Sequence, residues 1–314
     1  MSHRIVVLGG AHLDRRGRIA GETAPGASNP GSWQEDVGGG AFNVARNLAR
    51  LGHDVQMISP RGGDAAGEKV TAAALAAGIE DTPFVFLDRA TPSYTAILER
   101  DGNLMIALAD MDLYRLFTPR RLRTRSLRDA IARVDLIICD ANLPSETLSA
   151  LAALAREKNL PIAGIAISPA KVVHFENCLP DLTYLFMNAA EATALAGRRA
   201  LHAGEWPELL RIRGLRGGVV TRGGDELAAF SDAGSFTVHP PATPEIADVT
   251  GAGDALAAGT LDALLSGRPL AQSLRFGIAA SRITLASPHA VAPEFNRDLL
   301  RREAALVANP ETVS

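Results

Sequence analysis

The sequence has few cysteines and no long apolar run. Only two of its 314 residues are cysteine, Cys139 and Cys178, and neither has a partner at metal-ligand spacing. Two scattered cysteines favour a reducing compartment. No apolar run reaches the roughly 18 residues of a membrane span, and residues 1–8 lack the apolar core and small-residue cleavage site of a signal peptide. We therefore expect a cytoplasmic protein that does not enter a membrane.

The sequence also lacks an excess of charge and the motifs of several enzyme classes. Its formal net charge is -3, so no overall basic field favours binding to nucleic acid. It contains no Gly-x-x-x-x-Gly-Lys-Ser/Thr motif, which argues against a P-loop NTPase. No Gly-x-Gly-x-x-Gly follows the first apolar run, which argues against a dinucleotide-dependent oxidoreductase.

The chain instead contains a regular alternation of short apolar runs and helical patterns. Residues 5–8 are typical of a buried strand, and residues 41–51 place their apolar side chains on one helical face. Asp101-Gly102, between the apolar runs 94–98 and 104–108, predicts a β-hairpin. Further strands are predicted at 55–59, 136–139, 162–167, 184–187 and 218–221, a second hairpin at 227–230 and 236–239, and further helices at 65–77, 145–156, 205–212, 252–265 and 270–285.

We expect residues 1–314 to form one domain of the α/β class. Strands that alternate with helices favour a parallel sheet covered on both faces. The predicted fold is therefore a three-layer α/β/α arrangement around a central, mostly parallel sheet. The first hairpin interrupts the alternation. We expect the segments near 12–37 and 93–112 to form a small additional β-sheet, which we interpret as a lid.

The segment that is most informative about chemistry runs from Asp248 to Asp254, with the sequence DVTGAGD. Its small residues stand where a loop turns into a helix, so backbone N–H groups can approach an anion closely at a helix N-terminus. A carboxylate in the first helical turn, Asp254, is then placed to accept a proton from a substrate hydroxyl. The alternative interpretation is a glycine-rich helix cap in which Asp254 compensates the helix dipole.

This segment resembles the second signature of the ribokinase-like sugar kinases, the PfkB family. The resemblance implies a ribokinase-like fold and transfer of a phosphoryl group from ATP. It implies that Asp254 is the catalytic base and that Gly251, Ala252 and Gly253 form an anion hole. Family members often use a monovalent cation there, which implies a K+ site at Asp248 and Thr250, beside the loop at 286–290.

Two further stretches resemble the sugar-binding parts of the family. The run Gly38-Gly39-Gly40 followed by Asn43 resembles the first signature, which implies that Gly38, Gly39 and Asn43 lie near sugar hydroxyls. An asparagine offers both a donor and an acceptor, which suits a diol. After the first strand, Asp14 matches the sugar-binding aspartate of the family. His12 stands where the family usually has asparagine, so its contact with substrate stays open, and a polar strand-end residue is the alternative.

Two more matches concern the nucleotide. Asn188 and Glu191 fit the Asn-x-x-Glu motif, which organises Mg2+ and phosphates through water in the family. Thr221, Gly223 and Gly224 fit the strand-end stretch that lies along the nucleotide phosphates. The resemblance therefore implies ATP and Mg2+ as cofactors, with K+ as a further candidate.

Two stretches of the expected lid narrow the choice of substrate. Ser28-Asn29-Pro30-Gly31 and the hairpin at 94–112 resemble those of bacterial pseudouridine kinases, and Gly40 replaces the lysine of ribokinase proper. Asp110 and Asp112 are candidates to pair with ring N–H groups of a uracil, or alternatively cap the hairpin exit. We expect phosphorylation of the 5′-hydroxyl of a ribonucleoside, pseudouridine first. Another sugar or nucleoside kinase, or a non-catalytic sensor, is the alternative. Because the lid sheet is expected to be exposed, two copies of the chain could form a homodimer through it.

Overall fold

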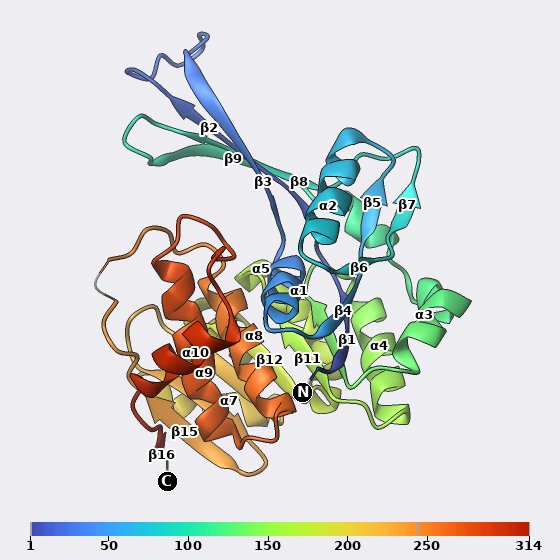
Figure 1. Cartoon of the computed structure of the whole chain (residues 1–314), viewed down its shortest axis with the longest axis vertical. Helices are drawn as coiled ribbons and strands as arrows, with labels where there is room; N and C mark the ends of the chain where they lie inside the picture. The colour runs from blue at the N-terminus through green and yellow to red at the C-terminus, as the bar shows by residue number, and fades with distance from the viewer. Residues whose placement is uncertain (1, 244, 314) are drawn as a thin grey trace.

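A computed structural model of the chain describes residues 2–243 and 245–313. Within them the largest element is a ten-stranded sheet with the order β16-β15-β14-β13-β12-β11-β10-β1-β4-β6 (Figure 1). Neighbouring strands are parallel from β6 to β13, and β14, β15 and β16 extend the sheet antiparallel. The strands are β1 (Arg4–Leu8), β4 (Asp54–Ile58), β6 (Glu80–Asp81), β10 (Leu136–Asp140), β11 (Ile162–Ile165), β12 (Tyr184–Asn188), β13 (Gly218–Thr221), β14 (Leu227–Ser231), β15 (Gly234–Val238) and β16 (Glu311–Thr312).

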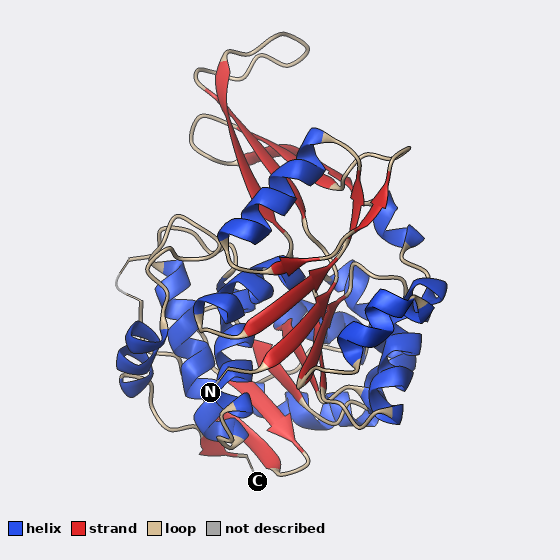
Figure 2. Cartoon of the chain, turned by 45° about the vertical axis from the view of Figure 1, so that its right-hand side comes forward, coloured by secondary structure: helices blue, strands red, loops and turns tan. Residues whose placement is uncertain are grey.

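Helices cover both faces of this sheet, as the alternation predicts (Figure 2). Because side chains alternate along a strand, β1 sends Ile5 and Val7 into one hydrophobic core and Val6 and Leu8 into the other. This burial on two sides explains the continuous apolar run at 5–8. The first core includes α1 (Gly40–Arg50), α2 (Ala65–Ala76), α8 (Ala252–Leu265), α9 (Leu270–Leu285) and α10 (Arg297–Ala305), and the second includes α3 (Arg125–Ile131), α4 (Ser145–Glu157), α5 (Pro169–Val172), α6 (Ala189–Ala196) and α7 (Trp206–Ile212). The 3-10 helices are η1 (Asp112–Leu116), η2 (Pro119–Arg123), η3 (Val173–Asp181) and η4 (Ala203–Glu205).

A second sheet of four strands stands away from the body as the predicted lid (Figure 1, top). Its order is β3-β2-β8-β9, with β2 parallel to β8 and the other two pairs antiparallel. The Asp101-Gly102 hairpin is confirmed as the connection between β8 and β9. The strands are β2 (His12–Ile19), β3 (Gly31–Gly38), β8 (Ser93–Leu98) and β9 (Leu104–Asp110), and a separate two-stranded sheet pairs β5 (Pro60–Gly62) with β7 (Phe84–Phe86). The α/β fold with a mostly parallel sheet and a small lid sheet is thus confirmed.

The register of the lid decides which residues share a face. Asp14 on β2 is in register with Tyr94 on β8, which is in register with Ala109 on β9. One position away, Ser93 pairs with Asp110. Since neighbouring positions along a strand point to opposite faces, Asp110 lies on the face of the lid sheet opposite to Asp14.

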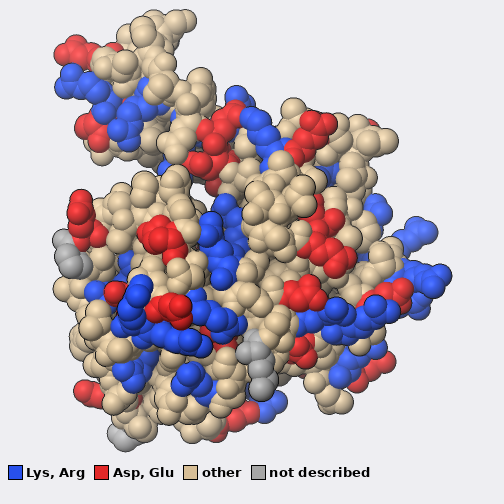
Figure 3. Space-filling view, in the orientation of Figure 1, with Lys and Arg blue, Asp and Glu red and all other residues tan. Residues whose placement is uncertain are grey.

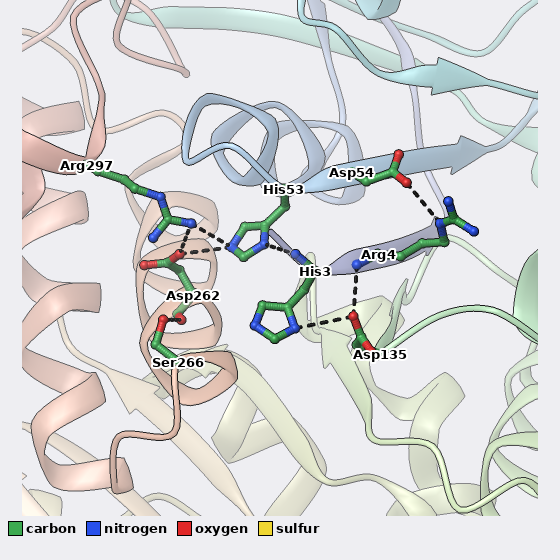
Figure 4. A network of polar contacts seen from close by, with 8 residues as sticks. All are labelled: His3, Arg4, His53, Asp54, Asp135, Asp262, Ser266 and Arg297. Atoms are coloured by element: carbon green, nitrogen blue, oxygen red, sulfur yellow. Dashed lines mark hydrogen bonds and ion pairs between the residues drawn. The ribbon is translucent and has the colours of Figure 1, made fainter. Parts of the chain in front are cut away.

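A buried polar network joins the far ends of α1 and α8 (Figure 4). His53, which follows α1, places Nε2 at 2.9 Å from Asp262 Oδ1 on α8. Its Nδ1 accepts the backbone N–H of His3, so the ring hydrogen lies on Nε2 and is donated to Asp262. Arg297, at the start of α10, pairs with the same carboxylate at 3.0 Å. The two helices that carry Asn43 and Asp254 are therefore fixed to each other at both ends.

Among the described residues, no helix combines the length and the apolar character needed to cross a bilayer.

Candidate active site

A cavity of about 300 Å³ lies where the lid meets the carboxyl ends of the sheet strands. Figure 3 shows the molecule hollowed between the lid, at the upper left, and the body below it. Carboxyl ends of parallel strands are the usual place for ligands in open α/β sheets. The cavity is lined by His12, Asp14, Gly39, Gly40, Asn43, Asn142, Ile165, Ala166, Ile167, Phe186, Met187, Asn188, Glu191, Val219, Thr221, Thr250, Gly251, Gly253, Asp254 and Leu256.

Asp254 lies in the first turn of α8 and points into this cavity. Its Oδ2 accepts a hydrogen bond of 2.8 Å from Nδ2 of Asn43 on α1. Burial raises the pKa of Asp254 to about 7, against the hydrogen bond from Asn43, and the negative charge of Asp140 raises it further. The positive charge of Arg46 acts to lower the same pKa. Asp254 can therefore exchange a proton near neutral pH.

The orientation of Asn43 is set by Arg46, one helical turn along α1. Nη2 of Arg46 donates to Oδ1 of Asn43 and to the carbonyl oxygen of Val37. With Oδ1 occupied by Arg46, the amide must turn Nδ2 toward Asp254. Asn43 therefore keeps one N–H for a substrate, and Arg46 uses one of the two lone pairs of its Oδ1. Contact of this amide with a diol stays a prediction.

The predicted anion-hole residues form the turn into α8. Gly251 has φ 79, and a side chain there would lie 2.1 Å from the carbonyl oxygen of Ala290. Only glycine fits this close approach. At Gly253 a side chain would meet nothing within 4 Å, because this position faces open space. The first N–H groups of a helix have no partner inside it, so the turn offers donors to an anion at the cavity wall.

The predicted sugar-side residues also meet at the cavity. His12 Nδ1 lies 3.0 Å from the hydroxyl of Tyr114, and its Nε2 lies 3.4 Å from Asp14 Oδ1. His12 thus links a buried tyrosine to Asp14 and fixes how that carboxylate faces the cavity. A side chain at Gly38 would lie 2.0 Å from Asp14 Oδ2. Gly38 is therefore needed to leave room for Asp14.

The next two glycines are constrained by the backbone and by Asp254. Gly39 has φ 113, and a side chain there would lie 2.3 Å from the carbonyl oxygen of Gly10. At Gly40 it would lie 2.3 Å from Ile167 and 3.3 Å from Asp254 Oδ1. A side chain at Gly40 would therefore require the tip of Ile167 to move and would crowd Asp254.

Asn188 and Glu191 form a capping box at the start of α6. Asn188 Oδ1 accepts from the N–H groups of Ala190 and Glu191, and Glu191 Oε2 accepts from the N–H of Asn188 at 2.7 Å. Glu191 is buried, and burial raises its pKa in spite of these hydrogen bonds. Both residues line the cavity, and the capping box uses Oε2 of Glu191 rather than Oε1. Among residues 2–243 and 245–313, no three His, Cys, Asp or Glu side chains converge to hold a metal ion.

A second cavity of about 310 Å³ adjoins the first and shares Thr221, Gly253 and Leu256 with it. Gly223 and Gly224, which follow β13, lie on its wall. The remaining wall is mainly apolar: Leu227, Pro240, Pro241, Ala242, Thr243, Ile246, Val249, Ala252, Ile278, Ser281, Arg282 and Leu285. The turn at 251–253 thus lies between the cavity that contains the Asp254 carboxylate and a second, more apolar cavity.

Sequence reasoning missed a polar cluster at the end of β10. Buried Asp140 accepts hydrogen bonds from the N–H groups of Gly10, Ala41 and Asn142. Asn142 lines the cavity, and its Oδ1 accepts from Lys171 at 2.6 Å. Burial raises the pKa of Asp140 and lowers that of Lys171. The sequence does contain a signal for this cluster, because polar residues directly follow the buried run 136–139.

Asp110 and Asp112 lie outside the cavity. They line a separate depression of about 270 Å³ with Arg89, Ala90, Leu113 and Leu116. Asp110 ends β9 on the lid face opposite to Asp14, and Asp112 begins η1 and lies 3.5 Å from Arg115. The structure therefore does not bring the two carboxylates to the residues around Asp254, which corrects the expected arrangement.

Comparison with known proteins identifies the family of the chain. The model of the pfkB family carbohydrate kinases matches residues 2–295. A pseudouridine kinase from Escherichia coli K12 is 27% identical over 317 residues, which cover 99% of this chain and 98% of that protein. The structure of a carbohydrate kinase from Agrobacterium tumefaciens is 56% identical, with a TM-score of 0.91 over 99% of this chain and 100% of that one. The structure of Arabidopsis thaliana ribokinase with ribose and ATP shares the fold, with 19% identity and a TM-score of 0.84 over 97% of this chain and 99% of that one. The chain therefore belongs to the pfkB family of carbohydrate kinases, which are ATP-dependent phosphotransferases.

Proposed function

We propose that this kinase transfers the γ-phosphoryl group of ATP to the 5′-hydroxyl of a ribonucleoside, with pseudouridine as the preferred substrate. The observation that carries the proposal is that Asp254 lines the same cavity as Asp14 and Thr221. A sugar held by Asp14 and a triphosphate held near Thr221 would meet at this carboxylate. Enzymes catalyse phosphoryl transfer mainly by positioning the two reactants and by stabilising the charge of the transition state.

In the proposed reaction, Oδ1 of Asp254 takes the proton of the 5′-hydroxyl, because Oδ2 is occupied by Asn43. The 5′-oxygen forms a bond to the γ-phosphorus while the bond from that phosphorus to the β,γ-bridging oxygen breaks, which releases ADP. N–H groups of Gly251 and Gly253 would stabilise the charge on the transferred group, together with that of Ala252, which in the structure donates to the carbonyl oxygen of Val249 at 3.3 Å. A pKa of about 7 suits Asp254 to this task near neutral pH.

ATP is proposed to span both cavities. Its phosphates would follow Thr221, Gly223 and Gly224 to the turn at 251–253, and its base would occupy the second cavity, whose wall is mainly apolar. When bound, Mg2+ neutralises phosphate charge. Glu191 uses Oε2 in the capping box with Asn188, so its Oε1 could accept a hydrogen bond from a water of such an ion. This fits the preference of Mg2+ for water and few carboxylates.

The preference for pseudouridine rests on two lines of support. The Escherichia coli pseudouridine kinase is similar to this chain over nearly the full length of both proteins. Gly40 stands where ribokinase proper has a lysine, which is in line with a substrate other than free ribose. A kinase for ribose, adenosine or inosine is the alternative, and a non-catalytic sensor is disfavoured by the intact Asp254 site.

The test is a screen for ADP release with ribose, pseudouridine, uridine, adenosine and inosine, followed by kcat/KM for the best two. Pseudouridine is expected to give the highest kcat/KM. A site that pairs a buried N–H rejects an analogue lacking it, and uridine has one ring N–H fewer. A higher kcat/KM for uridine, adenosine or ribose would contradict the pseudouridine assignment, while the kinase assignment would stand.

We also infer that two copies pair through the lid. Trp33, Ile106 and Leu108 are 57%, 64% and 70% exposed. The register places Trp33 and Ile106 on one face, because both strands align with the same positions of β2 and β8. An apolar face of this kind is typical of a surface that another protein covers.

A further inference from the structure

The lid contacts the loop before α8 through a charged pair. Nη1 of Arg16, on β2, lies 3.4 Å from Oδ2 of Asp248, although the two residues are 232 positions apart. The other oxygen, Oδ1, accepts hydrogen bonds of 2.8 Å from both the N–H and the hydroxyl of Thr250. Both carboxylate oxygens of Asp248 are therefore engaged by donors of the protein itself.

This arrangement does not fit the monovalent cation that the family resemblance implies at Asp248 and Thr250. At the position that the resemblance implies, such an ion would compete for the Asp248 carboxylate with the positive charge of Arg16, which already lies against it. The side chains of Arg16 and Asp248 are only 32% and 26% exposed, so solvent screens this charge incompletely. Burial acts to raise the pKa of Asp248, but the hydrogen bonds of Thr250 and the charge of Arg16 hold it below its ordinary value. The carboxylate is ionised and already paired.

We propose that Arg16 takes the place of the monovalent cation, so that this kinase does not require K+, and that it couples the lid to the phosphate-binding turn as a positioning residue. Asp14 lies two residues before Arg16 on β2 and therefore on the same face of the lid sheet. A substrate that orders Asp14 also orders Arg16. Asp248 in turn holds Thr250, which directly precedes Gly251. One strand thus connects the sugar side of the cavity with the anion-binding turn.

The first test measures ion binding without any substrate. The unfolding temperature is recorded in KCl and in choline chloride at equal ionic strength, because a bound ion stabilises the folded state by mass action. For the wild type we expect no difference between the two salts. For Arg16→Ala we expect a higher unfolding temperature in KCl. A K+-specific rise in the wild type, or none in Arg16→Ala, would overturn the proposal, whatever the substrate of the kinase is.

The second test rests on the proposed phosphoryl transfer and uses the best substrate of the screen. Wild-type kcat should change less than about twofold when KCl replaces choline chloride, whereas Arg16→Ala should lose about fivefold in choline chloride, as for one partly exposed charged contact. KCl should restore most of that loss. Arg18→Ala is the matched control, since Arg18 lies on the same face of β2 and makes no ion pair with the described residues. A wild type that needs K+ would refute the proposal, as would an Arg16→Ala variant without a K+ response.

Discussion

Asn43 donates its amide hydrogen to Asp254 across 2.8 Å, and this bond joins the first turns of two helices that lie 211 residues apart in the sequence. It occupies Oδ2 of the carboxylate and leaves Oδ1 for the substrate. Because Arg46 donates to the opposite end of the same amide, a guanidinium group, an amide and the proposed base are joined by two successive hydrogen bonds.

Replacement of Asp254 by Asn removes the base and keeps its shape. We expect kcat to fall by roughly 10²- to 10⁴-fold, the range of a positioned acid or base. Affinity for ATP should be unchanged, as measured by calorimetry, since the phosphate donors at 251–253 remain. Near-full turnover in Asp254→Asn would remove this residue from the role of base.

The pH dependence of kcat should report the pKa of Asp254. The base works when ionised, so kcat should fall as the pH drops through about 7, the raised pKa of this carboxylate. Arg46→Met removes a positive charge that lowers this pKa. Its pH profile should therefore move to higher pH. Arg50→Met is the control, because Arg50 lies on the same helix but donates to the Pro293 carbonyl, and its pH profile should stay in place. An unchanged pH profile in Arg46→Met would contradict the effect of Arg46 on the pKa of Asp254.

Removal of the sugar-side carboxylate should weaken substrate binding. Asp14→Ala should cost about 1.5–3 kcal/mol of nucleoside binding free energy, the value of a hydrogen bond to a charged group. Calorimetric titration of the nucleoside measures this cost. Asp101→Ala, at the tip of the hairpin, serves as control. If Asp14→Ala binds as tightly as the control variant, the sugar lies elsewhere.

The two lid carboxylates outside the cavity should not decide the choice of base. For Asp110→Ala and Asp112→Ala, we expect the ratio of kcat/KM for pseudouridine to that for uridine to stay within about twofold of wild type, since neither side chain lines the cavity and surface changes are usually small. A much smaller ratio in either variant would restore these residues as base-recognition groups.

The apolar face of the lid should hold two copies together. Ile106→Asp places a charge on a side chain that is 64% exposed in the single chain, so the fold should tolerate it while an apolar interface should not. Light scattering after size exclusion should show a dimer for the wild type and a monomer for the variant. Leu87→Asp, an exposed residue away from the lid strands, is the control. A monomeric wild type would exclude the pairing.

Structural features that lie within one contiguous segment could be predicted from the sequence. The turn at 251–254 is a contiguous segment, so the position of Asp254 at a helix start was readable from glycine placement alone. The hairpin was readable as well, because Asp101-Gly102 lies between two apolar runs. Its register was not, because Glu99 bonds to Asn103 and an irregularity between Ile97 and Leu98 then brings Ser93 opposite Asp110.

Features that depend on distant segments were not readable. The face that Asp110 occupies relative to Asp14 depends on how β8 pairs with β2, and about 80 residues separate those positions. The same holds for Asp140, whose partners Gly10 and Ala41 come from the first part of the chain. Pattern reasoning fixes periodicity within an element, whereas these contacts are set by packing between elements.

The bond from the backbone of His3 to His53 has a practical consequence for the handling of this protein. His53 holds Asp262, eight residues and about 12 Å along α8 from Asp254. An affinity tag fused before residue 3 would therefore be attached next to this clamp. Within the described residues, β16 at the opposite end of the chain pairs with β15 at the edge of the sheet. Recombinant protein intended for kinetic work should therefore carry its tag at the C-terminus.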